Sequence, residues 1–259
     1  MQVYALDENR LISTLRAEKG ADYRCPECLA TIRLRSGDVR QSHFFHLKTN
    51  SACRQSQKGL IHLRLQRYVK YLFDDDAEME KAFPSIGRIA DIAAVKSYKI
   101  VEIQYSPMTL EEAKARCHDY ESLGYTMIWI LHDHTFNKKK VRPVEQFLRT
   151  KTCYFSNMDV EGNGIIYDQL EQIDHKKRIL VGPKQPVNLR ISKPLPPFRW
   201  PRELAQRAQT WPLCHEGDLL ALALKGKPLL KPIPPQKLLL RLKDAYVTGL
   251  YQALERSSR

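Results

Sequence analysis

The spacing of apolar and polar positions predicts a β-rich start, a mixed centre of helices and strands, and an interrupted end for this chain of 259 residues. Near the start, short apolar and polar runs at 2–6, 11–17, 31–35 and 39–45 predict strands joined by tight turns. From 59 to 73, apolar residues recur at helical spacing with basic residues between them. This pattern predicts a helix with one buried face and one solvated basic face.

The centre of the chain changes from one periodicity to the other several times. We expect strands at 78–83, 88–95, 100–106 and 125–132, and a helix at 109–123. The last of these strands is apolar almost throughout, which is typical of a strand that is covered on both faces. A helix, three strands, a helix and a further strand in this order predict a mixed α/β layer.

Two carboxylates and an amide fall on neighbouring strands of this centre. Because side chains alternate across a strand, Glu102 shares a face with Gln104, and a turn at 96–99 makes Asp91 a hairpin neighbour of Glu102. The Ile103 carbonyl adds another oxygen. Such donors suit Mg²⁺ or Mn²⁺, and a bound ion of this kind activates water for phosphodiester hydrolysis. The alternative is an ordinary strand-end acid beside an exposed sheet face.

Cysteine and histidine spacing predicts a second metal site near the start of the chain. Cys25 and Cys28 form a Cys-x-x-Cys pair, and His46 and Cys53 follow the predicted hairpin, with His43 as a reserve ligand. Four such ligands suit tetrahedral zinc and leave no open position, so this zinc would stabilise the fold. A redox pair and disulfides are the alternatives.

The net charge of +13 is concentrated in the last third of the chain. Residues 176–259 hold 17 of the 42 Lys and Arg, 5 of the 29 Asp and Glu, and 11 of the 15 Pro. The prolines predict short helices on an extended path, and the charge favours a polyanion such as nucleic acid, although a merely soluble basic tail is the alternative. Four aromatic residues there either stack on single-stranded bases or form a small core. They are Phe198, Trp200, Trp211 and Tyr246.

Four further motifs occur in order along the centre of the chain. They are Arg88-Ile89-Ala90-Asp91-Ile92, Ile100-Val101-Glu102-Ile103-Gln104-Tyr105-Ser106, Arg116 with Tyr120, and Trp129-Ile130. Together they resemble the competence protein CoiA family and the wider PD-(D/E)XK nuclease superfamily. The resemblance implies a restriction-endonuclease-like mixed sheet flanked by helices, a role in handling incoming DNA during natural transformation, and Asp91, Glu102 and Gln104 as catalytic residues. Most members of the superfamily have Lys at the position of Gln104, whereas CoiA-like sequences generally have Gln.

The resemblance also implies nucleic-acid contacts from both predicted helices. Similar proteins have a His at the position of His62 and, four residues later, a Lys where this chain has Gln66. Arg116 and Tyr120 lie four apart on one helix face and are candidates for contacts with phosphate and sugar. The alternatives are a helix-surface or capping role for His62 and a structural pairing within the helix layer for the other two.

These patterns predict an N-terminal zinc-binding module at 1–54, a nuclease-like core at 55–175 and a basic C-terminal extension at 176–259. The leading hypothesis is a metal-dependent DNA nuclease that acts on incoming DNA. The rivals are a non-cleaving adaptor, which binds single-stranded DNA and recruits recombination or DNA-uptake proteins, and a zinc-stabilised protein-interaction module. No apolar stretch reaches the ~18 to 20 residues of a bilayer span and the start lacks the pattern of a secretion signal, so we expect a cytoplasmic protein without membrane insertion.

Overall fold

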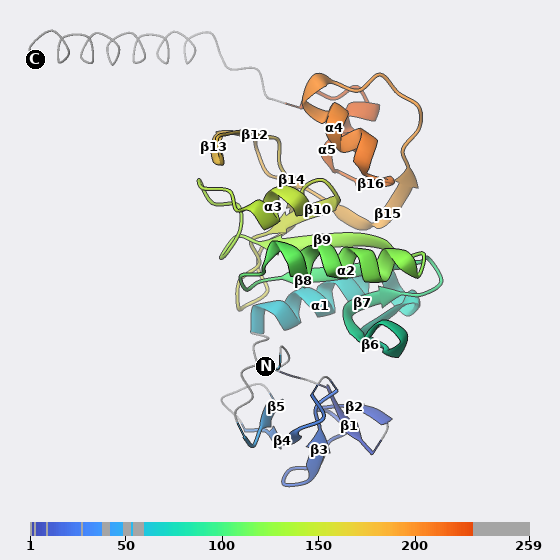
Figure 1. Ribbon diagram of the computed structural model, residues 1–259, viewed down its shortest axis with the longest axis vertical. Coiled ribbons are helices and arrows are strands. Elements are labelled where there is room, and N and C mark those ends of the chain that lie inside the picture. Colours follow the sequence, from blue (N-terminus) through green and yellow to red (C-terminus); the bar gives the residue numbers. More distant parts are fainter. Residues whose placement is uncertain are drawn as a thin grey trace, which may run out of the picture.

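The computed structural model describes residues 2, 4–8, 10–26, 28–37, 42–48, 53 and 60–229. Figure 1 shows a small β module at one end of the long axis, an α/β centre, and the helices of the C-terminal part at the other end. The strand expected at 39–45 is described only from residue 42 onward, and Tyr246 lies outside the described residues.

The described N-terminal residues form an antiparallel sheet in the strand order β2-β1-β3-β4-β5. Its strands are β1 (Tyr4–Asp7), β2 (Arg10–Ser13), β3 (Asp22–Arg24), β4 (Thr31–Arg35) and β5 (His43–His46). Alternate residues of these strands point inward and form a small core, in which Ala5, Ile32 and Phe44 are buried. Tyr23 meets Phe44 edge to face, with ring centroids 5.4 Å apart. The β-rich start predicted from the sequence is therefore present.

A larger mixed sheet occupies the centre, in the strand order β14-β11-β10-β9-β8-β7-β6 among the residues that the structure describes. Its strands are β6 (Ala77–Phe83), β7 (Arg88–Ala94), β8 (Lys99–Gln104), β9 (Thr126–His132), β10 (Thr152–Ser156), β11 (Ile166–Asp168) and β14 (Gln185–Pro186). β8, β9 and β10 run parallel to one another, and the other neighbours run antiparallel. The three parallel strands are buried along almost their whole length, as expected for strands covered on both faces.

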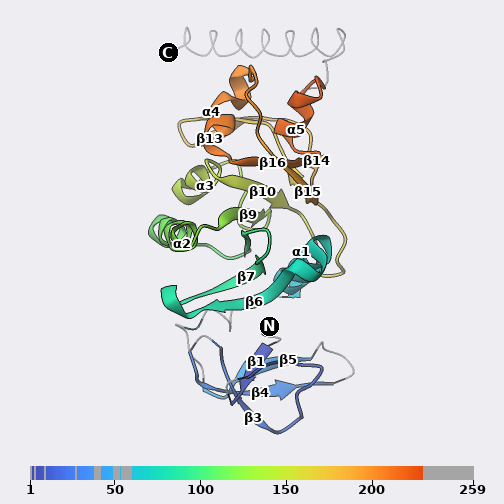
Figure 2. The same cartoon turned by 90° about the vertical axis from the view of Figure 1, so that its right-hand side faces the viewer.

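Two helices lie on opposite faces of this sheet, α1 (Leu60–Phe73) on one and α2 (Leu110–Ser122) on the other (Figure 2). The Thr109 hydroxyl caps α2 by accepting a hydrogen bond from the N–H of Glu112 at 3.1 Å. Gly124 follows the last turn with a φ of 81°, which costs glycine little. The predicted mixed α/β layer with flanking helices is confirmed.

The described part of the basic C-terminal segment packs against the central sheet. Its described elements, besides β14, are β13 (Lys177–Val181), β15 (Asn188–Pro194), α4 (Arg202–Thr210), β16 (Leu213–Glu216) and α5 (Leu219–Leu224). The short elements earlier in the chain are η2 (Asp74–Asp76), η3 (Pro84–Ile86), α3 (Pro143–Leu148) and β12 (Glu171–Asp174). Leu189, Leu204 and Trp211 belong to the same hydrophobic cluster as the sheet. Trp211 lies edge to face with Tyr154, with ring centroids 5.5 Å apart, so its indole is part of the core. The expected short helices are present, but up to α5 they are packed against the sheet and do not follow an extended path.

Candidate functional site

The candidate site lies where β7 and β8 stop pairing. The register between these strands runs from Ala94 opposite Lys99 to Ile92 opposite Val101. At the next position the Asp91 side chain turns toward β8, and its Oδ2 accepts a hydrogen bond from the N–H of Ile103 at 2.9 Å. A carboxylate therefore satisfies a backbone donor at the point where the two strands separate.

Asp91 is brought together with two residues of α1. Its Oδ1 lies 3.1 Å from His62 Nε2 and accepts a hydrogen bond from Gln66 Nε2 at 3.2 Å. His62 and Gln66 are four residues apart, so both side chains leave the same face of the helix. His62 is buried, which rules out the helix-surface interpretation.

Glu80 of β6 completes this group, and the sequence analysis missed it. Gln66 Nε2 donates to Glu80 Oε1 at 2.5 Å and so bridges the carboxylates of Glu80 and Asp91. Glu80 has a φ of 53° and, among the described non-glycine residues with positive φ, is the one that lies in a strand. Simple alternation along β6 would put the side chain of Glu80 on the same face as that of the exposed Glu78. The left-handed backbone at Glu80 interrupts this alternation, and its side chain is buried. The pairing of Met79 with Ile92 and of 81 with 90 on either side puts Glu80 opposite Asp91.

The donor set of His62, Glu80 and Asp91 fits a divalent metal ion. One ligand atom from each residue lies within 4.8 Å of the other two, and all three residues are buried. An imidazole nitrogen with two carboxylates suits Mn²⁺ better than Mg²⁺, because magnesium strongly prefers oxygen ligands and water. Glu102 lies outside this group of ligand atoms.

Glu102 is brought together with α2. Its side chain is 1% exposed and its Oε2 accepts a hydrogen bond from the guanidinium of Arg116, which also donates from Nε to Glu112 Oε1 at 2.9 Å. Burial acts to lower the pKa of Arg116, but the charges of Glu102 and Glu112 outweigh it and raise this pKa above its ordinary value. Arg116 is thus held as a cation between two carboxylates.

Tyr120 and Gln104 complete the residues predicted from the sequence. Tyr120 is buried, and burial, followed by the charge of Glu102, raises the pKa of its phenol; Asp91 contributes in the same direction. The charges of Glu102 and Asp91 therefore both raise the pKa of the Tyr120 phenol. Gln104 is half-buried at the end of β8, where its Nε2 donates to the carbonyl of Ser106 at 2.6 Å.

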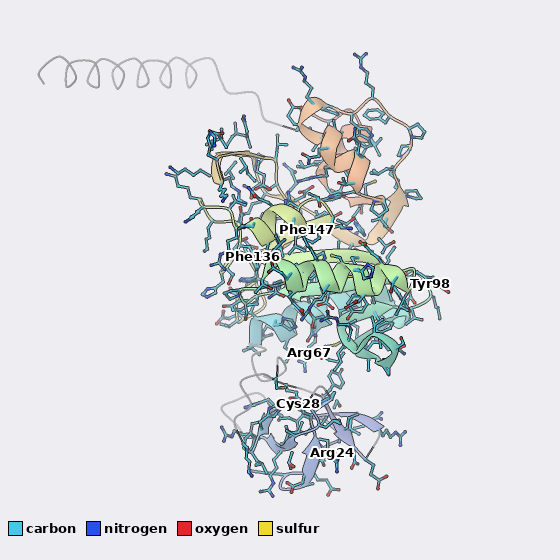
Figure 3. The ribbon with its side chains drawn as sticks, in the orientation of Figure 1. Arg24, Cys28, Arg67, Tyr98, Phe136 and Phe147 are labelled. Atoms are coloured by element: carbon cyan, nitrogen blue, oxygen red, sulfur yellow. The ribbon has the colours of Figure 1, made fainter. Side chains whose placement is uncertain are left out.

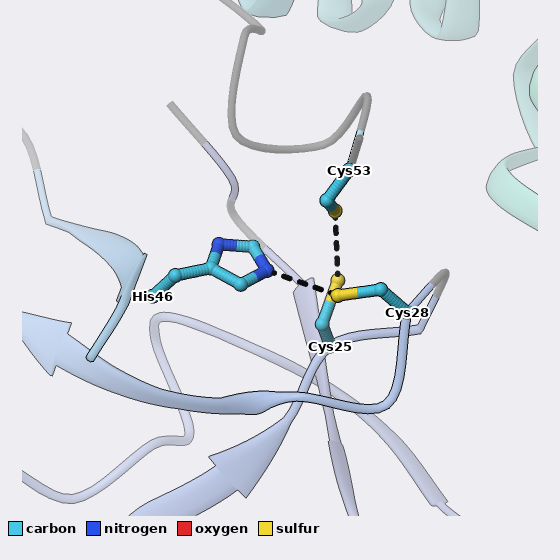
Figure 4. A group of neighbouring side chains, drawn as sticks. All are labelled: Cys25, Cys28, His46 and Cys53. Atoms are coloured by element: carbon cyan, nitrogen blue, oxygen red, sulfur yellow. Dashed lines mark hydrogen bonds between the residues drawn. The ribbon is translucent and has the colours of Figure 1, made fainter. Parts of the chain in front are cut away.

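The predicted zinc ligands converge in the N-terminal module (Figure 4). Cys25 Sγ lies 3.5 Å from Cys53 Sγ, and Cys28 Sγ lies 3.2 Å from His46 Nε2. One ligand atom from each of the four residues lies within 4.8 Å of the others. Zinc–sulfur bonds of about 2.3 Å in a tetrahedron require sulfurs about 3.8 Å apart, so the group can hold a zinc ion. None of the six cysteines, all within the described residues, forms a disulfide.

The fold explains the choice of ligands. Between Cys25 and Cys28 the chain makes a tight turn, because the N–H of Leu29 donates to the carbonyl of Cys25 at 3.0 Å. On β5, His46 lies opposite Ile32 and joins the metal-binding group. His43 stands three positions earlier on the same strand, and therefore projects from the other face and lies outside this group.

The comparisons with known proteins match two consecutive segments of the chain. Residues 5–56 match the N-terminal domain of competence protein CoiA, and residues 62–174 match its nuclease-like domain. No match was found among curated proteins or among solved structures. Within the described residues, none of the helices has the length and apolar character needed to cross a bilayer. The two matches follow each other in the order expected for the family and together cover most of the chain, which therefore belongs to the competence protein CoiA family.

Proposed function

We propose that this protein processes incoming DNA during natural transformation, and that its nuclease-like domain hydrolyses phosphodiester bonds with a divalent metal ion. The observation that carries the proposal is the buried group of His62, Glu80 and Asp91. Two buried carboxylates repel each other and lose hydration, and a cation between them compensates both costs. The match of residues 62–174 to a nuclease-like domain supports the same conclusion.

In this proposal Asp91 is the central ligand, because it touches α1 and β8 at once. A bound divalent ion would polarise the phosphodiester and lower the pKa of the attacking water. His62 and Glu80 would hold this ion together with Asp91. Gln66 orients both carboxylates through its amide.

Glu102 and Gln104 act from the neighbouring strand in this proposal. Glu102 supplies a second carboxylate toward an ion shared with Asp91, and Gln104 orients the attacking water. The register of β7 and β8, in which the position after the pair Ile92 and Val101 sets Asp91 opposite Glu102, supports their closeness. Arg116 then has two roles: it positions Glu102, and its remaining donors would contact a DNA phosphate. The Cys25, Cys28, His46 and Cys53 group holds a structural zinc ion.

A cleavage assay tests the proposal. Purified protein is incubated with single-stranded and duplex DNA in the presence of Mn²⁺ or Mg²⁺, and compared with Asp91→Ala and Glu80→Ala. Each substitution removes a ligand, so we expect cleavage to fall at least about a hundredfold. Glu78→Ala is the matched control, because Glu78 lies on the same strand but its side chain is 54% exposed. Equal cleavage by wild type and Asp91→Ala would reject the catalytic role.

A non-cleaving adaptor that binds single-stranded DNA and recruits recombination proteins is the second candidate. The observation that favours it is Gln104, a neutral side chain whose amide donates to the carbonyl of Ser106, just beyond the end of its strand. No lysine therefore stands at this position to stabilise the charge that develops during hydrolysis. Intact DNA in the cleavage assay, together with salt-sensitive retention of single strands, would support the adaptor.

A further inference from the structure

Two lysine-rich segments that are far apart in the sequence lie side by side. One is the part 138–140 of the loop after β9, and the other is residues 176–177, at the end of the β12–β13 turn and the start of β13. Lys140 and Lys177 form an antiparallel bridge, and the N–H of Val141 donates to the carbonyl of Lys176 at 2.8 Å. All five lysines of the two segments are exposed. We call these five residues the lysine patch.

A buried arginine, Arg178, connects the two segments of the lysine patch. The side chain of Arg178 is 2% exposed and forms ion pairs of 2.6 Å with both Glu145 and Glu171. Its guanidinium also donates to the carbonyl of Lys138, and its backbone N–H donates to the carbonyl of Lys139 at 2.8 Å. The two segments are therefore fixed by backbone contacts, which leaves the lysine ammonium groups at the surface.

The arrangement concentrates positive charge and left-handed backbone at one exposed place. Like charges on adjacent segments repel one another. His175 and Lys176 occupy a two-residue turn with φ values of 43° and 65°, a conformation that normally favours Asn-Gly. Asp174 is the neighbouring acid in this turn, and it pairs with His175 at 3.7 Å. Strain and repulsion that persist at one exposed place indicate a partner that compensates them, and a polyanion does so.

The lysine patch lies at the same end of the sheet as Gln104. Gln104 is opposite Leu131 near the end of β9, and the loop that carries the patch leaves β9 directly afterwards. The Thr135 hydroxyl donates to the carbonyl of Tyr105, the residue after Gln104, at 2.6 Å. Figure 3 shows Phe136 of this loop at the end of the sheet opposite to Tyr98 in the β7–β8 turn.

We infer that the lysine patch binds the phosphate backbone of the DNA strand that enters the candidate site. The inference rests on the proposed function, because it takes DNA as the substrate. Five cations on a fixed surface can contact successive phosphates without reading bases, so the binding is independent of sequence. Each phosphate contact releases a counterion, and the affinity therefore falls steeply with salt.

Equilibrium binding as a function of salt tests the inference. The full chain is titrated with a fluorescent single strand of about 20 nucleotides without added Mg²⁺ or Mn²⁺, and compared with the triple variant Lys139→Gln, Lys140→Gln, Lys177→Gln. Loss of three contacts lowers the slope of log affinity against log salt by about 2, and the affinity at about 0.15 M salt at least tenfold. The same three positions changed to Arg keep the slope, which separates charge from folding.

A second triple variant provides the matched control. Lys19→Gln, Lys96→Gln and Lys225→Gln remove the same charge from exposed lysines elsewhere. If this control loses as much affinity as the patch variant, or if the wild type shows no salt-sensitive binding, the inference is overturned. Patch-dependent binding by a wild type that does not cleave DNA supports the inference and refutes only the proposed hydrolysis.

Discussion

The ion pair between Arg116 and Glu102 predicts a large loss of stability when Arg116 is replaced by Met. The Arg116 side chain is 16% exposed and that of Glu102 is 1% exposed, so the substitution leaves a buried carboxylate without its cation. Loss of one partner of a buried ion pair costs about 3 to 5 kcal/mol. Because the Arg116 side chain is not fully buried, we expect the lower end of this range, about 3 kcal/mol.

Guanidinium chloride unfolding measures this loss. In the double variant Arg116→Met, Glu102→Gln, most of the stability returns, because the buried charge is removed together with its partner. Lys151→Met is the control, since the side chains of Lys151 and Glu121 are 29% and 42% exposed and such pairs contribute less than about 1 kcal/mol. A loss below about 1 kcal/mol for Arg116→Met, or no recovery in the double variant, would refute this reasoning.

DNA binding by the same variant separates the two roles of Arg116. If the residue only positions Glu102, the salt slope of DNA binding stays unchanged. If its guanidinium also contacts a phosphate, the slope falls by about 0.7 for a single strand. The proposed function includes a direct contact between Arg116 and a phosphate, and it therefore requires the lower slope.

Three further predictions concern metal binding and pH. Cys53→Ser removes one zinc ion per chain by elemental analysis and lowers the unfolding temperature, whereas Cys153→Ser, at a buried thiol far along the chain, leaves the zinc content unchanged. Gln66→Glu places a third carboxylate beside Glu80, so the unfolding temperature without added metal falls. Added Mn²⁺ then raises the unfolding temperature of this variant more than that of wild type. An equal rise in both proteins would contradict the proposed site. Burial, with the charge of Asp168, raises the pKa of Asp218 from 3.8 to about 6. The stability that this proton contributes, about 3 kcal/mol, is present below pH ~4 and is lost as the pH rises through ~6. Denaturant titrations at several pH values should show this difference between wild type and Asp218→Asn, and parallel curves would contradict it.

Local signals in the sequence were sufficient to predict a central helix, a central strand and the cysteine and histidine group. The helix predicted at 109–123 begins beside its Thr109 cap and ends before Gly124, because both residues act on the adjacent backbone. The apolar run at 125–132 predicted a strand covered on both faces, and β9 is one. The Cys-x-x-Cys pair and the later His46 and Cys53 also converge as expected, since metal ligands follow a narrow spacing rule.

The candidate site was harder to predict from the sequence, because its contacts depend on tertiary structure. Simple alternation along the strand predicted at 78–83 would put Glu80 on the same face as the exposed Glu78. In the structure Glu80 is buried opposite Asp91 and has a left-handed backbone, which the sequence does not reveal. The spacing of Arg116 showed its helix face but not which carboxylate lies beneath that face. In the C-terminal segment the sequence left base stacking and core packing open for Trp211, because the choice depends on contacts with the distant central sheet.

Diffraction from crystals grown with Mn²⁺ tests the central claim most directly, because anomalous scattering locates the ion independently of activity. The account predicts an anomalous peak within about 2.0 to 2.3 Å of an Asp91 carboxylate oxygen, with His62 and Glu80 or Glu102 as further ligands. An occupied cysteine site in the same crystals would show that metals reach the protein. Absence of any peak at Asp91 under those conditions would contradict a divalent-metal site in the nuclease-like domain.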